Sequence, residues 1–460
     1  MDLLRALRLS LDMPQPPSLA LVGGGGKSAA LFALARQWLA AGARTVLITT
    51  TTHLGDWQAA QADVHWAVQT EEQLRAHLEM LPAGVVLLTG PKDENQPQRL
   101  GGMPPDVLRL LDSLRRRYGL PLLIEADGSR SKPLKAPAEH EPAIPDFVEM
   151  VVVVAGLRGL GRPLGEATVH RPELFAALAG LEDGEVVTAE ALRGVLTHPQ
   201  GGLKNIPPGA RRVALLNQAD TPERQAAGGA LAQRLLTDYD AALVAALDPQ
   251  DTPEPFAGKV FAAYEPAAGI LLAAGASTRY GQPKQLLEWQ GEALVRRAAR
   301  IALEGGLSPV VVVTGAHAEQ VRQALAGLEV SVVENPAWQE GQAASLRAGL
   351  SKLPASVGAA VFLLADQPLI TPTLVRGLLA VHRSSFSAIV APLIDGQRGN
   401  PVLFDRVTFP DLLTLQGDQG GRALFSRYPV AWLPWHDTGP LRDVDTPADY
   451  RALLDEAGEK

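Results

Sequence analysis

One stretch decides the fold of the second half of this chain: Leu271-Leu272-Ala273-Ala274-Gly275-Ala276-Ser277-Thr278-Arg279-Tyr280-Gly281-Gln282-Pro283-Lys284. The apolar run that leads into it, Gly269 to Ala274, is typical of a buried parallel strand that stops at a turn of small residues. Such a turn lets backbone N–H groups approach phosphate oxygens, while Arg279 and Lys284 supply positive charge for a triphosphate. We predict a nucleotide-phosphate loop here. The alternative is an ordinary turn after a strand.

The rest of the second half alternates strand-like and helix-like segments. The strand-like runs are 269–274, 310–314, 330–333, 360–364 and 388–391, and helical patterns cover 293–304, 319–325 and 374–382. This order predicts an α/β fold with a mainly parallel sheet flanked by helices, Rossmann-like in type. In such a sheet, ligands bind beyond the carboxyl ends of the strands.

Two acidic residues stand where that edge is expected. Asp366 follows the apolar run 361–365, and Asp445 lies in Asp443-Val444-Asp445-Thr446-Pro447. If the fold brings them together, they form an all-oxygen site suited to Mg²⁺, which can bridge triphosphate oxygens. The alternatives are a turn before Pro368 for Asp366 and a helix cap for Asp445.

Further polar residues in the second half fit the rest of a two-substrate site. Their amide, hydroxyl, carboxylate and guanidinium groups lie in small-residue turns, each of which would be a plain turn on its own. We predict that the nucleotide contacts Ala273, Ala274, Gly275, Ser277, Lys284, Asn335 and Ser345. We predict that a second substrate contacts Asn400, Asp418 and Arg422.

The first half has a glycine loop of its own. A strand at 18–22 leads into Gly23-Gly24-Gly25-Gly26-Lys27-Ser28 and then into a helix that reaches about Ala41. This order predicts a P-loop-like phosphate site formed by Gly24, Gly25, Gly26, Lys27 and Ser28. The loop is shorter than a standard Walker A loop, because Leu21 stands where that motif needs a glycine. The alternative is a tight packing turn between strand and helix.

Other polar groups follow later strands of the first half. Glu125 and Asp127 end an apolar strand and are candidates for holding Mg²⁺ or water, followed by the basic residues Arg130, Lys132 and Lys135. The alternative is a solvated charged loop. The segment Asn217-Gln218-Ala219-Asp220 is similar to a guanine-reading motif but has glutamine in place of its lysine. Asp220 would otherwise cap the helix that starts near Pro222.

Composition bounds the class of protein. The chain has 460 residues, a net charge of −8 and no cysteine, so we expect no nucleic-acid or membrane-binding surface, no disulfide and no thiolate chemistry. No apolar run reaches about 18 residues, and the N-terminus lacks a signal-peptide pattern, so we expect a soluble, cytoplasmic protein. A proline-rich polar segment at 248–255 indicates a linker, and we predict domains at 1–264 and 265–460.

Residues 268–455 resemble the MobA-like nucleotidyltransferases and, among them, the molybdenum cofactor cytidylyltransferases (MocA-like). The matching motifs are the loop from Leu272 to Lys284, Asp366-Gln367-Pro368, Gly399-Asn400-Pro401, Gly417-Asp418-Gln419-Gly420 and Asp443 to Pro447. The resemblance implies Mg²⁺-dependent transfer of CMP from CTP to molybdenum-molybdopterin with release of pyrophosphate. Ala274, in place of a second glycine, is closer to the cytidylyl branch, and Tyr280 replaces the family's usual methionine.

Most of residues 18–220 resemble the YqeC-like selenium-dependent hydroxylase accessory proteins. The resemblance rests on the glycine loop, Thr49 to Thr52, Glu125 to Ser129, Pro133 to Pro137, Glu139-His140-Glu141-Pro142 and His170-Arg171-Pro172. It implies binding of ATP or GTP and an accessory role toward a molybdenum hydroxylase apoenzyme. Two other functions stay open for the whole chain: nucleotidyl transfer to a sugar or polyol phosphate, and non-catalytic carriage of the cofactor.

Overall fold

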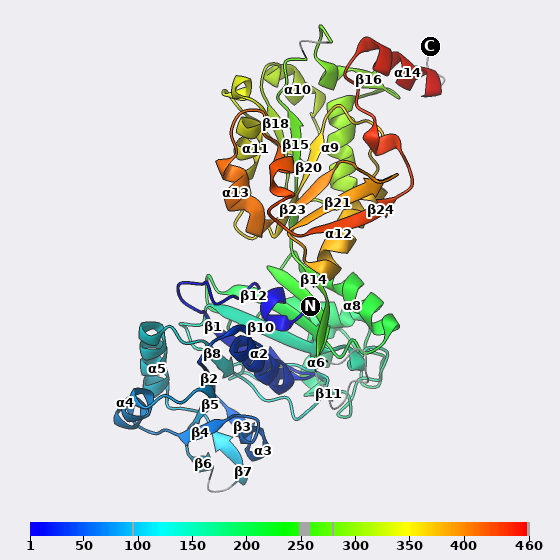
Figure 1. The fold of residues 1–460 in the computed structure, drawn as a ribbon. Helices are drawn as coiled ribbons and strands as arrows, with labels where there is room; N and C mark the ends of the chain where they lie inside the picture. The colour runs from blue at the N-terminus through cyan, green and yellow to red at the C-terminus, as the bar shows by residue number, and fades with distance from the viewer. Residues whose placement is uncertain (94–95, 248–257, 278–279, 458–460) are drawn as a thin grey trace. The chain divides into compact units, whose positions relative to one another are not determined.

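The structure, a computed structural model, describes residues 1–460 apart from 94–95, 248–257, 278–279 and 458–460. It divides into two compact units, Met1–Tyr264 and Glu265–Lys460. Each unit is built on a large, mainly parallel sheet flanked by helices, which confirms the predicted α/β class (Figure 1). Among the helices described, none is long and apolar enough to cross a membrane.

The first unit contains a nine-stranded sheet in the order β14-β13-β12-β10-β1-β8-β2-β5-β4. Its strands are β1 (Ser18–Gly23), β2 (Thr45–Thr50), β4 (Val64–Ala67), β5 (Gly84–Thr89), β8 (Leu122–Glu125), β10 (Met150–Gly156), β12 (Arg211–Asn217), β13 (Ala241–Ala246) and β14 (Lys259–Tyr264). Its longer helices are α2 (Lys27–Ala41), α4 (Glu71–Glu79), α5 (Pro105–Tyr118), α6 (Pro172–Ala179), α7 (Ala189–Thr197) and α8 (Pro222–Leu235).

Strand β1 lies in the middle of this sheet and positions the glycine loop. It pairs in parallel with β10 on one side and β8 on the other, with Val22 opposite Val153 and Leu21 opposite Glu125. The residues that follow these strands therefore meet at one edge. Helix α2 then begins at Lys27 and ends where Gly42 adopts a left-handed conformation, a common helix stop.

A small antiparallel sheet interrupts the parallel order after β2. It consists of β3 (His53–Gly55), β7 (Gln96–Gly101) and β6 (Lys92–Asp93) and lies below the large sheet in Figure 1. Glycines make this connection compact, since a Cβ atom on Gly102 would lie 2.7 Å from the carbonyl carbon of Thr51. The insertion brings Gln58 of the short helix α3 (Asp56–Ala59) back to the start of α2.

The second unit contains an eight-stranded sheet in the order β19-β18-β15-β20-β23-β21-β22, with β24 paired to β21. Its strands are β15 (Ala267–Ala273), β18 (Val310–Thr314), β19 (Ser331–Glu334), β20 (Ala359–Leu364), β21 (Ile389–Ile394), β22 (Gln397–Arg398), β23 (Val402–Asp405) and β24 (Val430–Trp435). Its helices include α9 (Leu294–Glu304), α10 (Ala318–Ala324), α11 (Gln342–Leu350), α12 (Pro372–Ser385), α13 (Phe409–Thr414) and α14 (Pro447–Ala457).

Two hydrophobic cores cover the faces of this second sheet. Helices α9, α10 and α12 pack on one face, while α11 and α13 pack on the other (Figure 1). Strand β15 lies between β18 and β20 and is parallel to both, with Leu272 opposite Val313 and Leu364. The loop after β15 and the residues after β20 consequently share one edge of the sheet.

Candidate functional site

The loop that follows β15 is closed by its own side chains. The hydroxyl of Ser277 donates to Oε1 of Gln285 at 3.0 Å and accepts from the backbone N–H of Lys284 at 3.0 Å. The amide of Gln285 in turn donates to the carbonyl of Gly275 at 3.2 Å. A Cβ atom on Gly275 would meet no atom within 4 Å, so there is open space above this part of the loop. Arg279 lies outside the described residues.

Lys284 joins the loop to both predicted metal ligands. Its Nζ lies 2.5 Å from Oδ2 of Asp366 and 2.7 Å from Oδ1 of Asp445. Burial by itself lowers the pKa of the Lys284 ammonium, but the two carboxylates outweigh that effect and hold the pKa above its ordinary value. Three residues that lie far apart in the sequence therefore form one charged cluster.

The segment around Asp445 is fastened to the end of β20 by two hydrogen bonds. The N–H of Val444 donates to the carbonyl of Asp366 at 2.9 Å, and the amide of Gln367 donates to Asp443 at 2.6 Å. The structure does not support the alternative interpretation of Asp445 as a helix cap. Thr446 caps helix α14 instead, because its hydroxyl accepts from the N–H of Asp449. The Asp445 carboxylate is left to contact Lys284.

The carboxylates at this edge fit the chemistry of a divalent cation. Oδ1 of Asp366 is buried and has no hydrogen-bond partner among the described residues. Burial raises the pKa of Asp443, and the neighbouring charges of Asp366 and Asp445 raise it further. The described part of the chain holds no group of three or more His, Cys, Asp or Glu side chains arranged for a metal. Mg²⁺ needs fewer, because it takes one or two carboxylates together with substrate phosphates and waters.

Asn335 and Ser345 are buried and bonded to each other rather than exposed to the loop. The Asn335 amide donates to the Ser345 hydroxyl at 3.1 Å, and its Oδ1 accepts from the N–H of Ala337 at 3.1 Å. Ala273 and Ala274 are also buried, at the end of β15. The Asn335–Ser345 pair therefore fixes the turn between β19 and α11.

The predicted second-substrate residues come from two different segments near the carboxyl edge of the second sheet. Asn400 precedes β23, which is antiparallel to β20 with Val402 opposite Phe362, so Asn400 lies near the end of β20. The segment at Asp418 packs on the start of α11, because a Cβ atom on Gly341 would lie 2.6 Å from Oδ1 of Asp418. Arg422 follows on a short, exposed 3₁₀ helix, η5 (Gly421–Leu424).

The glycine loop of the first unit uses several of its N–H groups internally. Gly23 donates to Oδ2 of Asp127 at 2.9 Å, Gly24 to the carbonyl of Val154 at 2.9 Å, and Gly25 to the carbonyl of Lys132 at 2.9 Å. The amides of Gly24 and Gly25, which we predicted to face phosphate, are thus already bonded. Within the described residues, no acceptor is found for the N–H groups that start helix α2, those of Gly26, Lys27 and Ser28.

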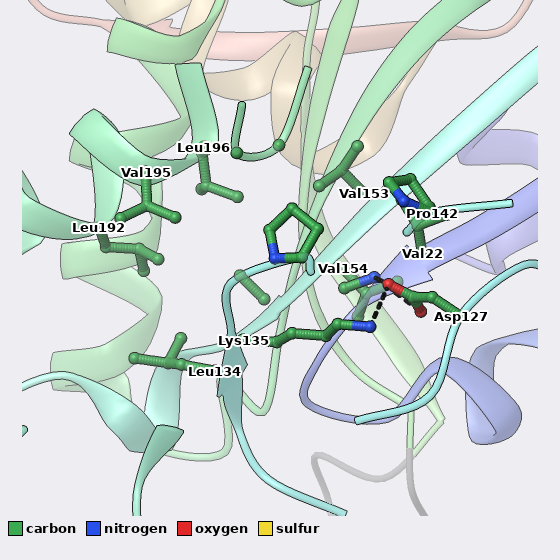
Figure 2. Close-up of a pocket in the computed structure, with 15 residues that line it drawn as sticks. Val22, Asp127, Leu134, Lys135, Pro142, Val153, Val154, Leu192, Val195 and Leu196 are labelled. Carbon is green, nitrogen blue, oxygen red and sulfur yellow. Dashed lines mark hydrogen bonds and ion pairs between the residues drawn. The ribbon is translucent and has the colours of Figure 1, made fainter. Parts of the chain in front are cut away.

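Buried charges form a chain beside this loop. Lys27 contacts the carbonyl of Gly23 at 2.6 Å and Asp127 at 3.2 Å. Lys135 bridges Asp127 at 2.8 Å and Glu141 at 2.6 Å, although burial lowers the pKa of its ammonium. Figure 2 shows Lys135 and Asp127 at the wall of a cavity of about 30 Å³ that is otherwise lined mainly by apolar side chains. This space holds only one or two water molecules.

A second polar group lies at the end of β2 and β8. The hydroxyl of Ser28 donates to Oε2 of Glu125 at 2.9 Å, and burial raises the pKa of the Glu125 carboxyl. The hydroxyls of Thr49, Thr51 and Thr52 are buried without a hydrogen-bond partner among the described residues. Because buried polar groups are normally paired, these hydroxyls mark room for a polar ligand or water.

The segment after β12 supports the loop instead of presenting a free base-reading carboxylate. The Asn217 amide donates to the carbonyl of Gly25 at 2.8 Å, and Oδ1 of Asn217 accepts from the N–H of Leu247 at 3.0 Å. Asp220 is paired with Arg158 and Arg224, both at 2.6 Å. The alternative interpretation of Asp220 as a helix cap is not supported, since the hydroxyl of the next residue, Thr221, caps helix α8.

In comparison with known proteins, each of the two units matches a protein family. Residues 19–173 match the family model of the YqeC protein, and residues 269–432 match the model of the MobA-like NTP transferase domain. The uncharacterized protein YqeC of Escherichia coli is 36% identical over 224 residues, which cover 48% of this chain and 83% of that protein. Nicotine blue oxidoreductase of Paenarthrobacter nicotinovorans is 36% identical over 197 residues, or 40% of this chain and 95% of that protein.

The chain belongs to both families, with a YqeC domain followed by a MobA-like NTP transferase domain. A probable molybdenum cofactor guanylyltransferase of Bacillus cytotoxicus is 27% identical over 135 residues, which cover 28% of this chain and 64% of that protein. In the transferase domain, Ser277, Lys284, Asp366 and Asp445 lie within the matched family region or just beyond its end.

The YqeC domain contains an ion pair that the sequence did not predict. Arg171 donates to both carboxylate oxygens of Glu141, at 2.7 and 3.0 Å, and thereby extends the charged chain from Lys135. Burial raises the pKa of Glu141, but the hydrogen bonds from Arg171 and Lys135 more than offset this and hold it at about 2. Glu141 lies in the motif Glu139 to Pro142, and Arg171 lies in the motif His170 to Pro172. The presence of both motifs was the only feature of the sequence that could have suggested the pair.

Proposed function

We propose that the MobA-like domain is a Mg²⁺-dependent nucleotidyltransferase that transfers CMP from CTP to the terminal phosphate of molybdenum-molybdopterin. The observation that carries the proposal is the contact of Lys284 with both Asp366 and Asp445 beside the Ser277 loop. Membership of the NTP transferase family supports the reaction class. The relationship to a probable molybdenum cofactor guanylyltransferase supports the acceptor.

The reaction needs no protein nucleophile. An oxygen of the acceptor phosphate attacks the α-phosphorus of the nucleotide in line, and the bond to the bridging oxygen of the β-phosphate breaks. Pyrophosphate leaves with the electron pair, and the new phosphoanhydride joins the acceptor to CMP. Lys284 and Arg279 stabilise the negative charge that develops on the transferring and leaving groups. Asp366 and Asp445 would hold Mg²⁺, which neutralises phosphate charge when bound.

The choice of CTP rests on Ala274, which stands at the end of β15 where a second glycine would favour the guanylyl branch. The decisive experiment incubates the full chain with Mg²⁺, each of the four NTPs in turn and molybdenum-molybdopterin, and measures pyrophosphate. We expect release with CTP, little with GTP, and a product that contains cytosine. Release with GTP alone would overturn the base assignment. Release only with a sugar or polyol phosphate would overturn the acceptor.

A matched pair of variants separates catalysis from simple carriage of the cofactor. Asp366→Asn removes a carboxylate that contacts Lys284, whereas Asp395→Asn changes an exposed carboxylate in the turn after β21. We expect the first variant to lose pyrophosphate release and the second to keep it. A wild-type chain that binds molybdenum-molybdopterin but releases no pyrophosphate with any NTP would instead be a carrier.

We also propose that the YqeC domain binds ATP or GTP and assists the maturation of a molybdenum hydroxylase apoenzyme. Support comes from the unbonded N–H groups at the start of α2, the adjacent Lys27, and the unpaired threonine hydroxyls at the end of β2. Equilibrium binding of ATP and GTP tests it. Lys27→Ala should abolish binding, while Lys92→Ala, which breaks only an exposed pair with Asp56, should leave it unchanged. Equal binding by both variants would contradict the proposal.

A further inference from the structure

Two arginines of the transferase domain lie close together without a neutralising partner. The guanidinium carbon of Arg398 lies 4.6 Å from the centre of the Phe425 ring. Arg422 stands three residues before Phe425 on the same short 3₁₀ segment, where the N–H of Phe425 donates to the backbone carbonyl of Arg422 at 3.2 Å. Neither arginine forms an ion pair or hydrogen bond through its guanidinium with the residues that the structure describes.

The two positive charges repel each other. Burial lowers the pKa of Arg398, and the positive charge of Arg422 lowers it further. Arg427, in the same segment, is neutralised by an ion pair, since its guanidinium lies 2.7 Å from Oδ2 of Asp411. The charge of Arg398 and Arg422 is therefore available for a ligand, and two planar guanidinium groups suit the oxygens of a phosphate dianion.

The pair lies on the edge of the sheet that carries the nucleotide site. Arg398 is opposite Leu393, at the carboxyl end of β21. Strand β21 is antiparallel to β23, and β23 is antiparallel to β20, so β21 and β20 run in the same direction. Arg398 and Asp366 thus follow the carboxyl ends of two parallel-running strands with only β23 between them. A ligand of the arginines would lie beside the nucleotide rather than in its place.

An exposed aromatic side chain adjoins the arginines. Trp432 on β24 is 42% exposed, and its ring centre lies 6.1 Å from that of Phe425. An exposed tryptophan that packs against a half-buried aromatic ring offers a flat apolar surface to a planar ring. We propose that Arg398 and Arg422 bind a phosphomonoester and that Trp432 packs against its planar organic part. Resting on the proposed function, this site would hold the phosphate of the acceptor.

The first test measures binding without catalysis. Phenyl phosphate is titrated with the full chain, and the broadening of its ³¹P resonance reports binding. Arg422→Ala and Arg398→Ala should each weaken binding about tenfold, since each removes charged hydrogen bonds. Arg398→Lys should bind phenyl phosphate more weakly than the wild type but more tightly than Arg398→Ala, because lysine keeps the positive charge but lacks the planar guanidinium group. Arg427→Ala is the matched control and should bind like the wild type. Equal broadening by all five proteins would overturn the site.

The second test assigns the bound group to the acceptor. In the pyrophosphate assay, Arg422→Ala should raise the KM for molybdenum-molybdopterin about tenfold and leave the KM for the nucleotide unchanged. A rise in the nucleotide KM alone would overturn the assignment to the acceptor. A wild-type chain without turnover would contradict the proposed function, whereas the phenyl phosphate result would stand independently.

Discussion

The ammonium group of Lys284 lies 2.5 Å from Oδ2 of Asp366, and the same nitrogen contacts Asp445 at 2.7 Å. The lysine thus occupies the space between the two carboxylates that a divalent cation would share. Under the proposed function, the Lys284 ammonium would have to give up these carboxylates to a divalent cation and would then be free to contact the phosphates of the nucleotide. Lys284 would contact the two carboxylates before the nucleotide binds and the triphosphate after it has bound.

Replacing Lys284 by methionine should therefore strengthen metal binding in the absence of nucleotide. We expect the affinity for Mn²⁺ to rise about tenfold, because the competing positive charge is gone and the two carboxylates remain. Electron paramagnetic resonance of free Mn²⁺ measures this directly. Lys352→Met, which changes an exposed lysine after helix α11, is the control. An unchanged affinity would show that the carboxylates do not bind the ion.

The same lysine should be needed for turnover. Lys284→Ala should lower kcat about a hundredfold, because one lost electrostatic contact to the transition state costs about 3 kcal/mol. The rate of pyrophosphate release at saturating nucleotide measures the effect, with Lys352→Ala as the control. Wild-type-like release by Lys284→Ala would refute the assigned role.

In the YqeC domain, Asp127 should be important for stability. It is buried between the ammonium groups of Lys27 and Lys135, so Asp127→Ala leaves two buried positive charges without it and should cost about 3–5 kcal/mol. Asp56→Ala, which breaks only an exposed pair with Lys92, should cost less than about 1 kcal/mol. Calorimetry of the full chain can follow both units. If no transition of Asp127→Ala moves to lower temperature relative to the wild type, this account is wrong.

Glu141 should make the YqeC domain sensitive to acid. Its pKa in the folded chain is about 2, below the ordinary 4.5, so the unfolded chain takes up the proton first as the pH falls. The stabilisation from Glu141 is complete above pH 4.5 and is lost between pH 4.5 and 2. Urea unfolding at several pH values should show that the free energy of unfolding falls less steeply between pH 4.5 and 2 in Glu141→Gln than in the wild type. The exposed neighbour substitution Glu139→Gln should keep the wild-type slope.

Gly25 should tolerate no side chain. Its φ is +82°, and a Cβ atom would lie 2.3 Å from the backbone nitrogen of Gly156. Gly25→Ala should destabilise the YqeC domain by at least about 2 kcal/mol through backbone strain and overlap. Gly128→Ala, where a Cβ atom meets nothing within 4 Å, provides the comparison and should be nearly neutral. Equal thermal stability of the two variants would show that the loop can move away.

The strands that were easiest to predict are continuous β-branched runs. Residues 310–314 were predicted as a strand and form β18 with the same bounds, because four valines and a threonine suit a strand buried on both faces. Strands β23 and β24 were not predicted. Val402–Asp405 is short and follows Pro401, and Val430–Trp435 contains Pro434, and a proline argues against a strand.

The positions of candidate site residues could be predicted where they follow the ends of parallel strands. They could not be predicted where a loop folds back onto an earlier segment. The rule that parallel strands gather ligands at one edge anticipated that Asp366 would lie beside the Lys284 loop. No spacing rule indicates that Lys135 returns to Asp127, or that the amides of Gly24 and Gly25 find carbonyl acceptors in distant segments. Those contacts arise only once the loop at 130–141 packs on β1 and β10.

The separation of 161 positions between Lys284 and Asp445 also sets the order in which the transferase site can be assembled. During synthesis, Lys284 and Asp366 leave the ribosome well before the segment that contains Asp445. Until then, the ammonium has only one carboxylate to contact, and helix α14 cannot yet pack Tyr450 against Tyr280 in the nucleotide loop. The transferase domain therefore gains its complete charged cluster only after the segment around Asp445 has been synthesised.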